Sequence, residues 1–268
     1  MASFARILGS GIAHAGRGLT RLFGRRTGAR AAAHASALLA PIVEANTPRG
    51  RLRFRCASAM AARHAADFVH HEPETRRWID EYIHDGEHLW DVGANVGLYT
   101  LYAALGDGVS VTSFEPVAAT FAQLTENIAL TELTERVVPL CIALSSRSGV
   151  APFYLASTEP GTAMHSLGKP ENAMGRFEPA RKMQVPAFRG DDLLGQLRLA
   201  APQHLKIDVD GHELSVLEGL GGLLGQIRTI CIEVEGADGA IEQFLARHGF
   251  ESNPSCSGRN RLFIRTKG

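Results

Sequence analysis

Apolar runs and amphipathic segments alternate along most of the chain, from about residue 88 onward. Runs rich in apolar and β-branched residues predict buried strands, and helical spacing of apolar residues predicts helices between them. We predict strands at Leu89–Trp90, 109–114, 137–144, 183–188, 205–209 and 229–234, with helices at 98–105, 118–129, 213–220 and 241–247 and a short helix beginning at Asp191. This alternation is typical of an α/β protein with a Rossmann-like, doubly wound, mainly parallel sheet. Residues 250–252 and 261–265 predict a closing antiparallel strand pair.

The pattern changes in the middle of the chain. Pro139 predicts that the third strand lies at a sheet edge or is irregular. Residues 145–181 lose helical periodicity and are rich in Gly, Pro, Ser, Thr and Asn, so we expect one short strand, Phe153–Leu155, inside a long loop. Loops of this length in a compact domain usually cover a site or move, which makes His165 and Ser166 candidate substrate contacts.

Composition divides the chain into three predicted parts. Residues 1–47 form a basic, Ala- and Arg-rich extension, and 48–87 form a lead-in with a strand at 51–55 and two helices. Residues 88–268 form the main α/β domain. Pro73 suits the first turn of the second lead-in helix, where its missing N–H costs nothing.

The extension has no acidic residue before Glu44, and it carries Arg6, Arg17, Arg21, Arg25, Arg26 and Arg30. Its apolar runs are too short to cross a bilayer, and they do not form a secretory signal. Three interpretations of residues 1–43 stay open. They are a loosely packed helical extension, a basic amphipathic helix in peripheral contact with an anionic membrane, and an organellar transit peptide.

The overall composition is that of an ordinary globular protein, with 45% hydrophobic and 21% charged residues. The formal net charge is +0, so no global field attracts nucleic acid, and we predict no nucleic-acid partner. The four cysteines, Cys56, Cys141, Cys231 and Cys256, are scattered and never form a Cys-x-x-Cys pair. This pattern predicts free thiols in a reducing compartment such as the cytoplasm, and neither a zinc site nor a disulfide framework.

A glycine loop, Asp91-Val92-Gly93-Ala94-Asn95-Val96-Gly97, connects the first main strand to a helix. Such loops approach nucleotide-like ligands closely. A dinucleotide dehydrogenase prefers Gly-x-Gly-x-x-Gly, and Asn95 stands where the second glycine would fall. The loop suits S-adenosylmethionine better: Asp91 can attract the ammonium group, and backbone N–H groups of Gly93, Ala94, Asn95 and Gly97 can hold the carboxylate.

Glu115 follows the second strand of this βαβ unit. A carboxylate at that position can accept hydrogen bonds from both hydroxyls of a ribose. Taken alone, Asp91 could cap a helix and Glu115 could be an exposed strand end. Their occurrence together at one βαβ spacing favours S-adenosylmethionine as the ligand.

The chain resembles the FkbM family of class I methyltransferases. The resemblance runs from Glu72 to Glu235 and rests on three ordered blocks: Asp91–Gly97, Phe114-Glu115-Pro116 and Ile207-Asp208-Val209-Asp210-Gly211-His212-Glu213. It implies the class I methyltransferase fold, S-adenosylmethionine as methyl donor, and a hydroxyl acceptor on a sugar, glycolipid or natural product. It also implies donor contacts at Pro116 and near Ala143. Asp210 stands where the family usually has Glu, and Ser146 stands where it often has an acid.

Transfer to a hydroxyl also requires a base, and open α/β sheets place their sites beyond the carboxyl ends of the strands. Our candidates follow the fourth strand: Asp208 first, then Asp210 and Glu213, with His212 as an alternative. Asp210 or Glu213 could instead cap the next helix, and His212 could face solvent. Mg²⁺ between Asp208, Asp210 and Glu233 is chemically conceivable, but the sequence does not require it, and we predict no metal.

Two other functions are compatible with this fold. One is methylation of RNA or another nucleic acid, although the sequence contains no Asn-Pro-Pro-Tyr or Asp-Pro-Pro-Tyr motif. The other is a non-catalytic membrane-surface protein on a methyltransferase fold. The presence of Asp91, Glu115 and Asp208 favours an enzyme that methylates a small-molecule or glycan acceptor.

Overall fold

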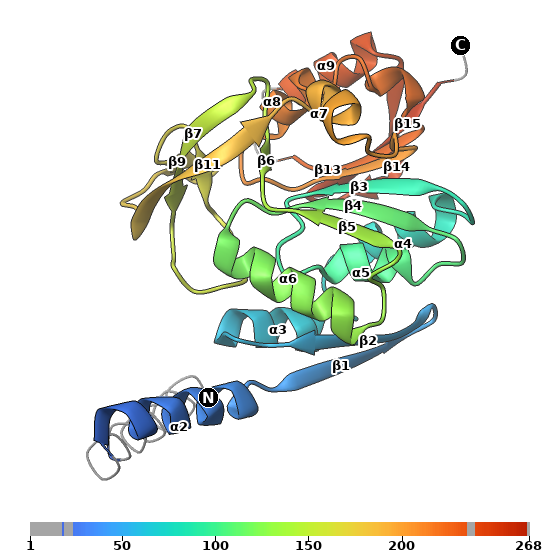
Figure 1. Ribbon diagram of the computed structural model, residues 1–268. Helices are drawn as coiled ribbons and strands as arrows, with labels where there is room; N and C mark the ends of the chain where they lie inside the picture. Colours follow the sequence, from blue (N-terminus) through green and yellow to red (C-terminus); the bar gives the residue numbers. More distant parts are fainter. Residues whose placement is uncertain (1–17, 19–23, 235–238, 267–268) are drawn as a thin grey trace. The chain divides into compact units, whose positions relative to one another are not determined.

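A computed structural model describes residues 18, 24–234 and 239–266, and contacts divide the chain into two compact units at Ile42/Val43 (Figure 1). The described part of the first unit is mainly helix α2 (Gly24–Leu39), which has no acidic residue in its first turn. No helix among the described residues is long and apolar enough to cross a membrane. Residues 1–17 and 19–23 of the predicted basic extension lie outside the described residues, and the three predicted domain boundaries stay a prediction.

The second unit is built on one seven-stranded sheet. Its strands are β3 (His88–Val92), β4 (Ser110–Phe114), β5 (Val137–Leu140), β12 (His204–Ile207), β13 (Thr229–Glu233), β14 (Phe250–Ser257) and β15 (Asn260–Arg265). Their order is β5-β4-β3-β12-β13-β15-β14, and all neighbours pair in parallel except β15, which is antiparallel to β13 and β14.

This topology confirms the predicted α/β fold with a closing antiparallel strand. Numbered within the sheet, the order is 3-2-1-4-5-7-6, the Rossmann order with an antiparallel strand inserted near one edge. The strands β4 and β5 follow on one side of β3, whereas β12 and β13 follow on its other side, so the strand order reverses between β3 and β12. Open α/β sheets bind their ligands at such a point. Pro139 lies in the edge strand β5, as predicted, where its missing N–H breaks no ladder.

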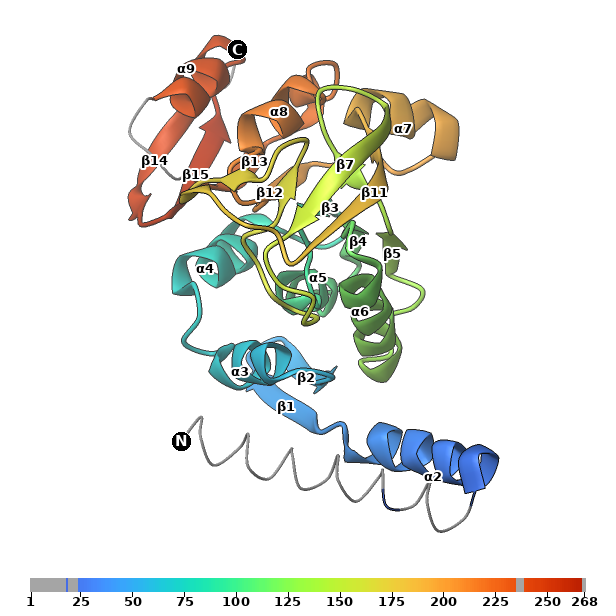
Figure 2. The ribbon, with the colours of Figure 1, turned by 90° about the vertical axis from the view of Figure 1, so that its left-hand side faces the viewer.

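Helices cover both faces of this sheet, as Figures 1 and 2 show. One face carries α4 (Pro73–Tyr82), α5 (Leu98–Ala104) and α6 (Ala118–Leu130), and the other carries α7 (Gly190–Leu197), α8 (Glu213–Glu218) and α9 (Ala240–Arg247). Alternate residues of β3 supply the two cores, with Leu89 on one side and Trp90 on the other. Each such buried side chain stabilises the fold by roughly 1.5–3 kcal/mol.

The segment predicted as a long loop, 145–181, has more structure than expected, and the strand predicted after it at 183–188 is confirmed as part of β11 (Arg181–Phe188). The strands β6 (Ala143–Leu144), β7 (Gly149–Leu155), β8 (Ser166–Leu167) and β11 form a second sheet, and β9 (Glu171–Asn172) pairs with β10 (Gly175–Arg176). The predicted strand 137–144 is wrong as one element, because β5 and β6 belong to different sheets. Pairs of only two residues carry no periodicity, which is why the sequence pattern does not reveal them.

The lead-in begins with a hairpin of β1 (Ile42–Thr47) and β2 (Gly50–Arg55), followed by α3 (Ala59–Asp67). The strand β1 was not predicted. Asn127 of α6 accepts a hydrogen bond from the Arg55 N–H at 2.8 Å, which ties the hairpin to the main domain. Ser58 caps α3 by accepting a hydrogen bond from the Ala61 N–H, so the helix begins at a defined place.

Candidate active site

The glycine loop crosses the carboxyl ends of the parallel strands. A Cβ atom on Gly93 would lie 1.8 Å from the carbonyl oxygen of Asp208, so only glycine allows β3 and β12 to approach this closely. Gly97 has a φ of 94°, and a Cβ atom there would meet Leu124 at 2.6 Å. Glycine is needed at position 93 because the backbone of the neighbouring strand end passes directly beside it, and at position 97 because of its positive φ and the Leu124 side chain of α6.

The N–H groups of this loop already have protein partners. Gly93 and Ala94 donate to the carbonyl oxygen of Phe114, both at 3.0 Å, and Gly97 donates to Ala94 at 2.9 Å. Asn95, with a φ of 51°, donates its N–H to Glu115 at 3.1 Å. The expected contact of these groups with a ligand carboxylate therefore stays a prediction.

Asp91 is fully buried at the end of β3. Its Oδ2 accepts a hydrogen bond from the Thr100 hydroxyl at 2.6 Å, whereas its Oδ1 has no hydrogen-bond partner among the described residues. The Lys206 ammonium lies 4.0 Å from that oxygen. Burial raises the pKa of Asp91, against the opposing effect of Lys206. A buried oxygen without a partner is costly in a protein that binds nothing there, and it indicates a missing donor.

Glu115 is buried at the end of β4. Its two oxygens accept hydrogen bonds from the Val117 N–H at 2.7 Å and the Asn95 N–H at 3.1 Å. Burial raises the pKa of Glu115 to about 7, although these two hydrogen bonds favour the ionised form. Each oxygen keeps a second lone pair, so the carboxylate can still accept hydrogen bonds from two hydroxyls.

Two adjoining pockets open at this end of the sheet. The first, which we call the apolar pocket, lies between the main and second sheets and has mainly apolar walls that include Phe114, Val117, Ile142, Ala143, Leu144 and Phe153. The second, the polar pocket, has walls that include His64, His71, Glu72, Lys206, Glu233 and Arg259. Both pockets share Gly93, Asn95, Ala163, Asp208 and Asp210, so one elongated ligand can extend from the first into the second.

Residues 91–252 match the methyltransferase FkbM domain, which is more than half of the chain. The chain belongs to the FkbM family of S-adenosylmethionine-dependent methyltransferases. This family membership, and the donor that it implies, confirm the expectations drawn from the three sequence blocks.

Several known proteins are similar to this FkbM-family chain. The hexuronic acid methyltransferase AglP of Haloferax volcanii is 31% identical over 163 residues, which are 61% of this chain and 62% of that protein. The 31-O-demethyl-FK506 methyltransferase FkbM of Streptomyces tacrolimicus is 29% identical, over 72% of this chain and 86% of that protein. A solved structure, a tRNA (m1A22) methyltransferase of Streptococcus pneumoniae in complex with S-adenosyl-L-methionine, aligns with 14% identity and a TM-score of 0.42, over 73% and 75% of the two chains.

The donor of this family fits the residues present. The unpartnered Asp91 Oδ1 needs a donor, and the ammonium of S-adenosylmethionine supplies one. Asn95 also has a buried side-chain oxygen without a partner among the described residues. Ala143 and Pro116, both expected to contact the donor, line the apolar pocket together with Glu115. These side chains suit an adenosine group, because its base is flat and largely apolar and its ribose is polar.

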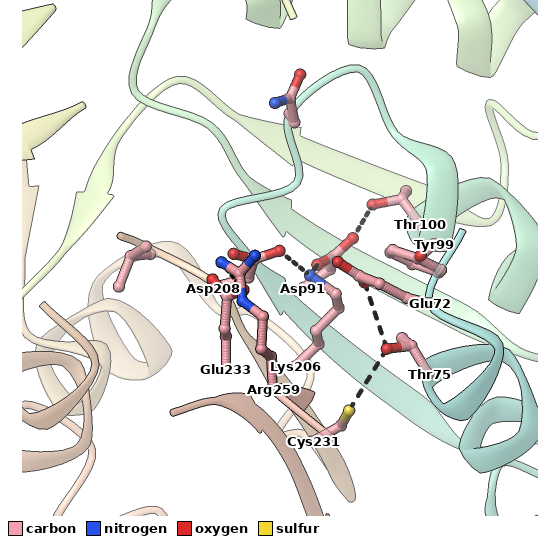
Figure 3. A network of polar contacts seen from close by, with 12 residues as sticks. Glu72, Thr75, Asp91, Tyr99, Thr100, Lys206, Asp208, Cys231, Glu233 and Arg259 are labelled. Carbon is pink, nitrogen blue, oxygen red and sulfur yellow. Dashed lines mark hydrogen bonds and ion pairs between the residues drawn. The ribbon is translucent and has the colours of Figure 1, made fainter. Parts of the chain in front are cut away.

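The expected acid–base residue Asp208 forms an ion pair. Its carboxylate accepts a hydrogen bond from the Lys206 ammonium at 2.9 Å, as Figure 3 shows. Burial acts to raise the pKa of Asp208, but the neighbouring Lys206 ammonium outweighs it and holds this pKa below its usual range. Lys206 also lies over the ring of Tyr99, 5.1 Å from its centre. Asp208 is therefore placed beside both pockets as a firmly ionised carboxylate, which is a weak base.

The other three expected residues, Asp210, His212 and Glu213, accept hydrogen bonds from the loop after β12 and from the segment that covers the pockets. Asp210 accepts a hydrogen bond from the Met164 N–H at 2.6 Å, and Glu213 accepts one from the Gly211 N–H at 3.0 Å. His212 accepts one from the Leu167 N–H through Nε2, at 3.2 Å. Of the two loop residues singled out beforehand, His165 is buried beside the apolar pocket and accepts a hydrogen bond from the Ala156 N–H. Ser166 lies beside His212, 3.1 Å from Nε2.

Sequence reasoning missed the contribution of the lead-in. His64, His71 and Glu72 line the polar pocket although they precede Asp91, where the glycine loop begins, by 19 to 27 residues. The pattern offered only a weak signal, a group of histidines near the start of α4. Arg259, from the turn between β14 and β15, completes the wall and pairs with Glu233 at 2.6 Å. Among the described residues, no group of three or more His, Cys, Asp or Glu side chains is arranged to hold a metal ion.

Proposed function

We propose that this protein transfers a methyl group from S-adenosylmethionine to a hydroxyl oxygen of a sugar or of another small molecule rich in hydroxyl groups. One observation carries the proposal: a buried carboxylate oxygen of Asp91, without a hydrogen-bond partner among the described residues, lies in the wall of the polar pocket, which adjoins the apolar pocket. The relatives support it, since one is named as a hexuronic acid methyltransferase and another as a methyltransferase of 31-O-demethyl-FK506.

In this proposal the apolar pocket holds the nucleoside of the donor. Glu115 accepts hydrogen bonds from the ribose hydroxyls, and the side chains around Pro116 and Ala143 contact the adenine. Asp91 holds the ammonium group, which gives its Oδ1 the hydrogen bond that the Lys206 ammonium, 4.0 Å away, does not supply. When bound, S-adenosylmethionine would supply an electrophilic methyl carbon on a sulfonium sulfur, which a nucleophile attacks in line with the carbon–sulfur bond while the sulfur leaves with the electron pair.

The amino-acid end of the donor reaches Asp91 in the wall of the polar pocket, and the methyl acceptor occupies the remainder of this pocket. Its walls carry the charged side chains of Glu72, Lys206, Asp208, Glu233 and Arg259, so they favour a ligand with many hydrogen-bonding groups over an apolar one. Asp208 lies beside both pockets and faces the place where donor and acceptor meet. Holding the two reactants in contact can supply about 7–11 kcal/mol of the barrier reduction, so much of the work of this site is positioning.

The residues after Asp208 have a positioning role in the same proposal. Asp210, His212 and Glu213 accept backbone N–H bonds from the covering segment and from their own loop. They keep the carboxyl end of β12 in place beside the donor. The low pKa of His212, which follows from its burial, keeps the imidazole neutral so that Nε2 can accept the Leu167 N–H.

Calorimetric titration with S-adenosylmethionine tests the donor half of the proposal. We expect the wild type to bind, and Glu115→Ala to bind at least about tenfold more weakly, because two charge-assisted hydrogen bonds to the ribose are lost. An exposed substitution, Asp107→Asn, is the matched control and should change nothing. Absence of binding to the folded wild type would contradict the proposal.

The acceptor half needs a transfer experiment. The protein is incubated with methyl-labelled S-adenosylmethionine and separated fractions of glycans, free sugars and apolar natural products. We expect label in a polar, hydroxyl-rich fraction, released as an O-methyl group. Label found only in RNA or in apolar products would contradict the proposed acceptor class while leaving the donor assignment intact.

Two expectations about location also remain proposals: action in the cytoplasm, and peripheral contact of residues 1–43 with an anionic membrane. Sedimentation with anionic and with neutral vesicles tests the second. We expect a chain that lacks residues 1–43 to lose binding to anionic vesicles. Equal sedimentation of the full and shortened chains would contradict the membrane contact.

A further inference from the structure

The walls of the polar pocket come from two different parts of the chain. Asp91, Lys206 and Asp208 lie within the 91–252 match to the FkbM domain, whereas His64 and Arg259 lie outside it. If the donor is held as proposed above, its nucleoside fills the apolar pocket and its reactive end points across the shared wall into the polar pocket. The side chains from outside the match therefore face the acceptor.

A hydroxyl acceptor must lose its proton during transfer, and most groups around the polar pocket are already engaged. Asp208 is paired with Lys206 at 2.9 Å, and Glu233 is paired with Arg259 at 2.6 Å. Glu72 accepts a hydrogen bond from Thr75 at 3.4 Å, as Figure 3 shows. The ion pair with Lys206 lowers the pKa of Asp208 and makes it a poor acceptor of a further proton, and Glu233 and Glu72 already have protein donors beside them.

His64 differs from them. It lies on α3 with a half-buried side chain in the wall of the polar pocket, and neither ring nitrogen has a hydrogen-bond partner among the described residues. Its ring packs beside that of His71, with 5.5 Å between the ring centres. The neighbouring His71 imidazole has a partner, because its Nδ1 lies 3.1 Å from the Tyr99 hydroxyl. His64 thus offers a lone pair to the pocket that no protein group uses.

We propose that His64 is the general base that accepts the proton of the acceptor hydroxyl. The acceptor oxygen forms its bond to the methyl carbon while the carbon–sulfur bond breaks and its electron pair stays on sulfur. The hydroxyl proton passes to a ring nitrogen of His64 and from there to solvent. No metal or other co-reactant is needed to balance this step.

The surroundings of His64 suit that role. Burial, together with the neighbouring His71 and Arg63, lowers the pKa of His64, while Asp67 and Asp208 act in the opposite direction. The imidazole is therefore neutral at pH 7 and able to accept a proton. Arg63 and Asp67 belong to the same helix, His71 follows it, and Asp208 belongs to the strand end across the pocket.

The test does not require the acceptor. The full chain, labelled in its histidine rings, is titrated by NMR in two saturated complexes, one with S-adenosylhomocysteine and one with sinefungin. Sinefungin carries a positively charged amine where the methyl group would stand, and S-adenosylhomocysteine has no charge there. If His64 faces the reacting centre, its pKa should be lower with sinefungin by at least about half a unit.

His64→Asn assigns the resonance, and the exposed His70 is the internal control, whose pKa should be equal in both complexes. An equal pKa of His64 in the two complexes would overturn the proposal. Because the titration uses the wild type, poor folding of the variant would not hide this result, and His64→Gln provides a second assignment. Failure of both ligands to bind by calorimetry would overturn the proposed function and, with it, this inference.

Discussion

The two ends of the main sheet both bury polar side chains, but these are satisfied in different ways. At the amino ends of the strands, the ring nitrogens of His88 lie 2.7 Å from the Ser110 hydroxyl and 2.9 Å from the Thr112 hydroxyl. His204 is held in the same manner, with Glu87 at 2.9 Å from one nitrogen and the Thr229 hydroxyl at 2.8 Å from the other. Every nitrogen of these two rings has a partner.

At the carboxyl ends of the strands, some buried polar atoms lack a hydrogen-bond partner among the described residues. Asp91 and Asn95 each keep a buried side-chain oxygen without a partner among the described residues, and Glu115 is an acid whose pKa is raised to about 7. Buried polar groups in native proteins are nearly always paired, so the two unpaired oxygens of Asp91 and Asn95, which lie in pocket walls, indicate a ligand that completes them. The polar side chains at the amino end therefore stabilise the fold. Those at the carboxyl end destabilise the free protein until a bound ligand supplies the missing hydrogen bonds.

Of the substitutions that test this difference between the two ends, we expect the largest effect from Asp91→Asn. The substitution keeps the shape of the side chain but removes the charge that we assign to the donor ammonium. Removing one member of a buried charge pair costs about 3–5 kcal/mol, so affinity for S-adenosylmethionine should fall by about 10²-fold or more. Calorimetric titration of the variant and the wild type with S-adenosylmethionine measures this loss of affinity.

The thermal stability of the free Asp91→Asn variant is the accompanying control. Burial raises the pKa of Asp91, so the folded protein disfavours the charged form of this side chain. Replacing it with neutral Asn should therefore leave the melting temperature unchanged or raise it. If the variant binds the donor as tightly as the wild type, Asp91 has a structural role and does not hold the donor ammonium.

His88→Ala should show the opposite pattern. It leaves the hydroxyls of Ser110 and Thr112 without their partner and opens a cavity, so the free energy of unfolding should fall by about 2–4 kcal/mol. Burial lowers the pKa of His88 from 6.5 to about 4, so the wild type binds fewer protons than its unfolded chain in that range and loses stability as pH falls through it. Denaturant titrations at pH 7 and pH 5 measure both effects.

The donor affinity of His88→Ala decides whether the two ends are independent. We expect less than a twofold change, because no part of the His88 side chain lines either pocket. The exposed His70→Ala should alter neither quantity. A large loss of donor binding in the His88 variant, at a temperature where it is folded, would show that the ends are coupled.

The sequence predicted the carboxyl end better than the rest. Strand periodicity placed Asp91 and Glu115 at the ends of adjacent parallel strands, and parallel strands bring their carboxyl ends together whatever lies between them. That geometric rule is why two residues 24 positions apart could be assigned to one site. The strand β1 and the two-residue strands β6, β8, β9 and β10 were less accessible as separate elements, because they depend on long-range contacts.

The polar pocket shows the limit of such reasoning more clearly. Asp208 was expected to act as a base from its residue type and place, but its pairing with Lys206 depends on a side-chain position that no spacing rule provides. His64 was overlooked because α3 reaches the pocket only through the fold of the lead-in. Neither fact could be predicted from the chain pattern, since both are matters of tertiary contact.

A smaller effect should come from pH. The pKa of Glu115 is about 7 in the free protein, and hydrogen bonds from ribose hydroxyls favour its ionised form. Donor binding then requires release of a proton below pH 7, and affinity should fall by up to about tenfold for each unit of pH below that value. Calorimetry between pH 5.5 and 7.0 measures this slope, below the range in which the donor amino group titrates. Glu115→Gln should bind more weakly and lose the slope, and an unchanged slope in that variant would assign the titration to another group.

The smallest effect that we predict separates the two unpaired oxygens at the carboxyl end. Asn95 has a φ of 51°, which glycine adopts without strain, so Asn95→Gly should remove the side chain at little cost in stability. The amide oxygen is neutral, and one hydrogen bond of that kind contributes about 0.5–1.5 kcal/mol, so donor affinity should fall by only about threefold to tenfold. Calorimetry of Asn95→Gly beside Asp91→Asn makes the comparison directly. An equal loss in the two variants would mean that Asn95 acts through the loop conformation and the N–H bond to Glu115, because a neutral oxygen cannot match the contribution of a buried charge.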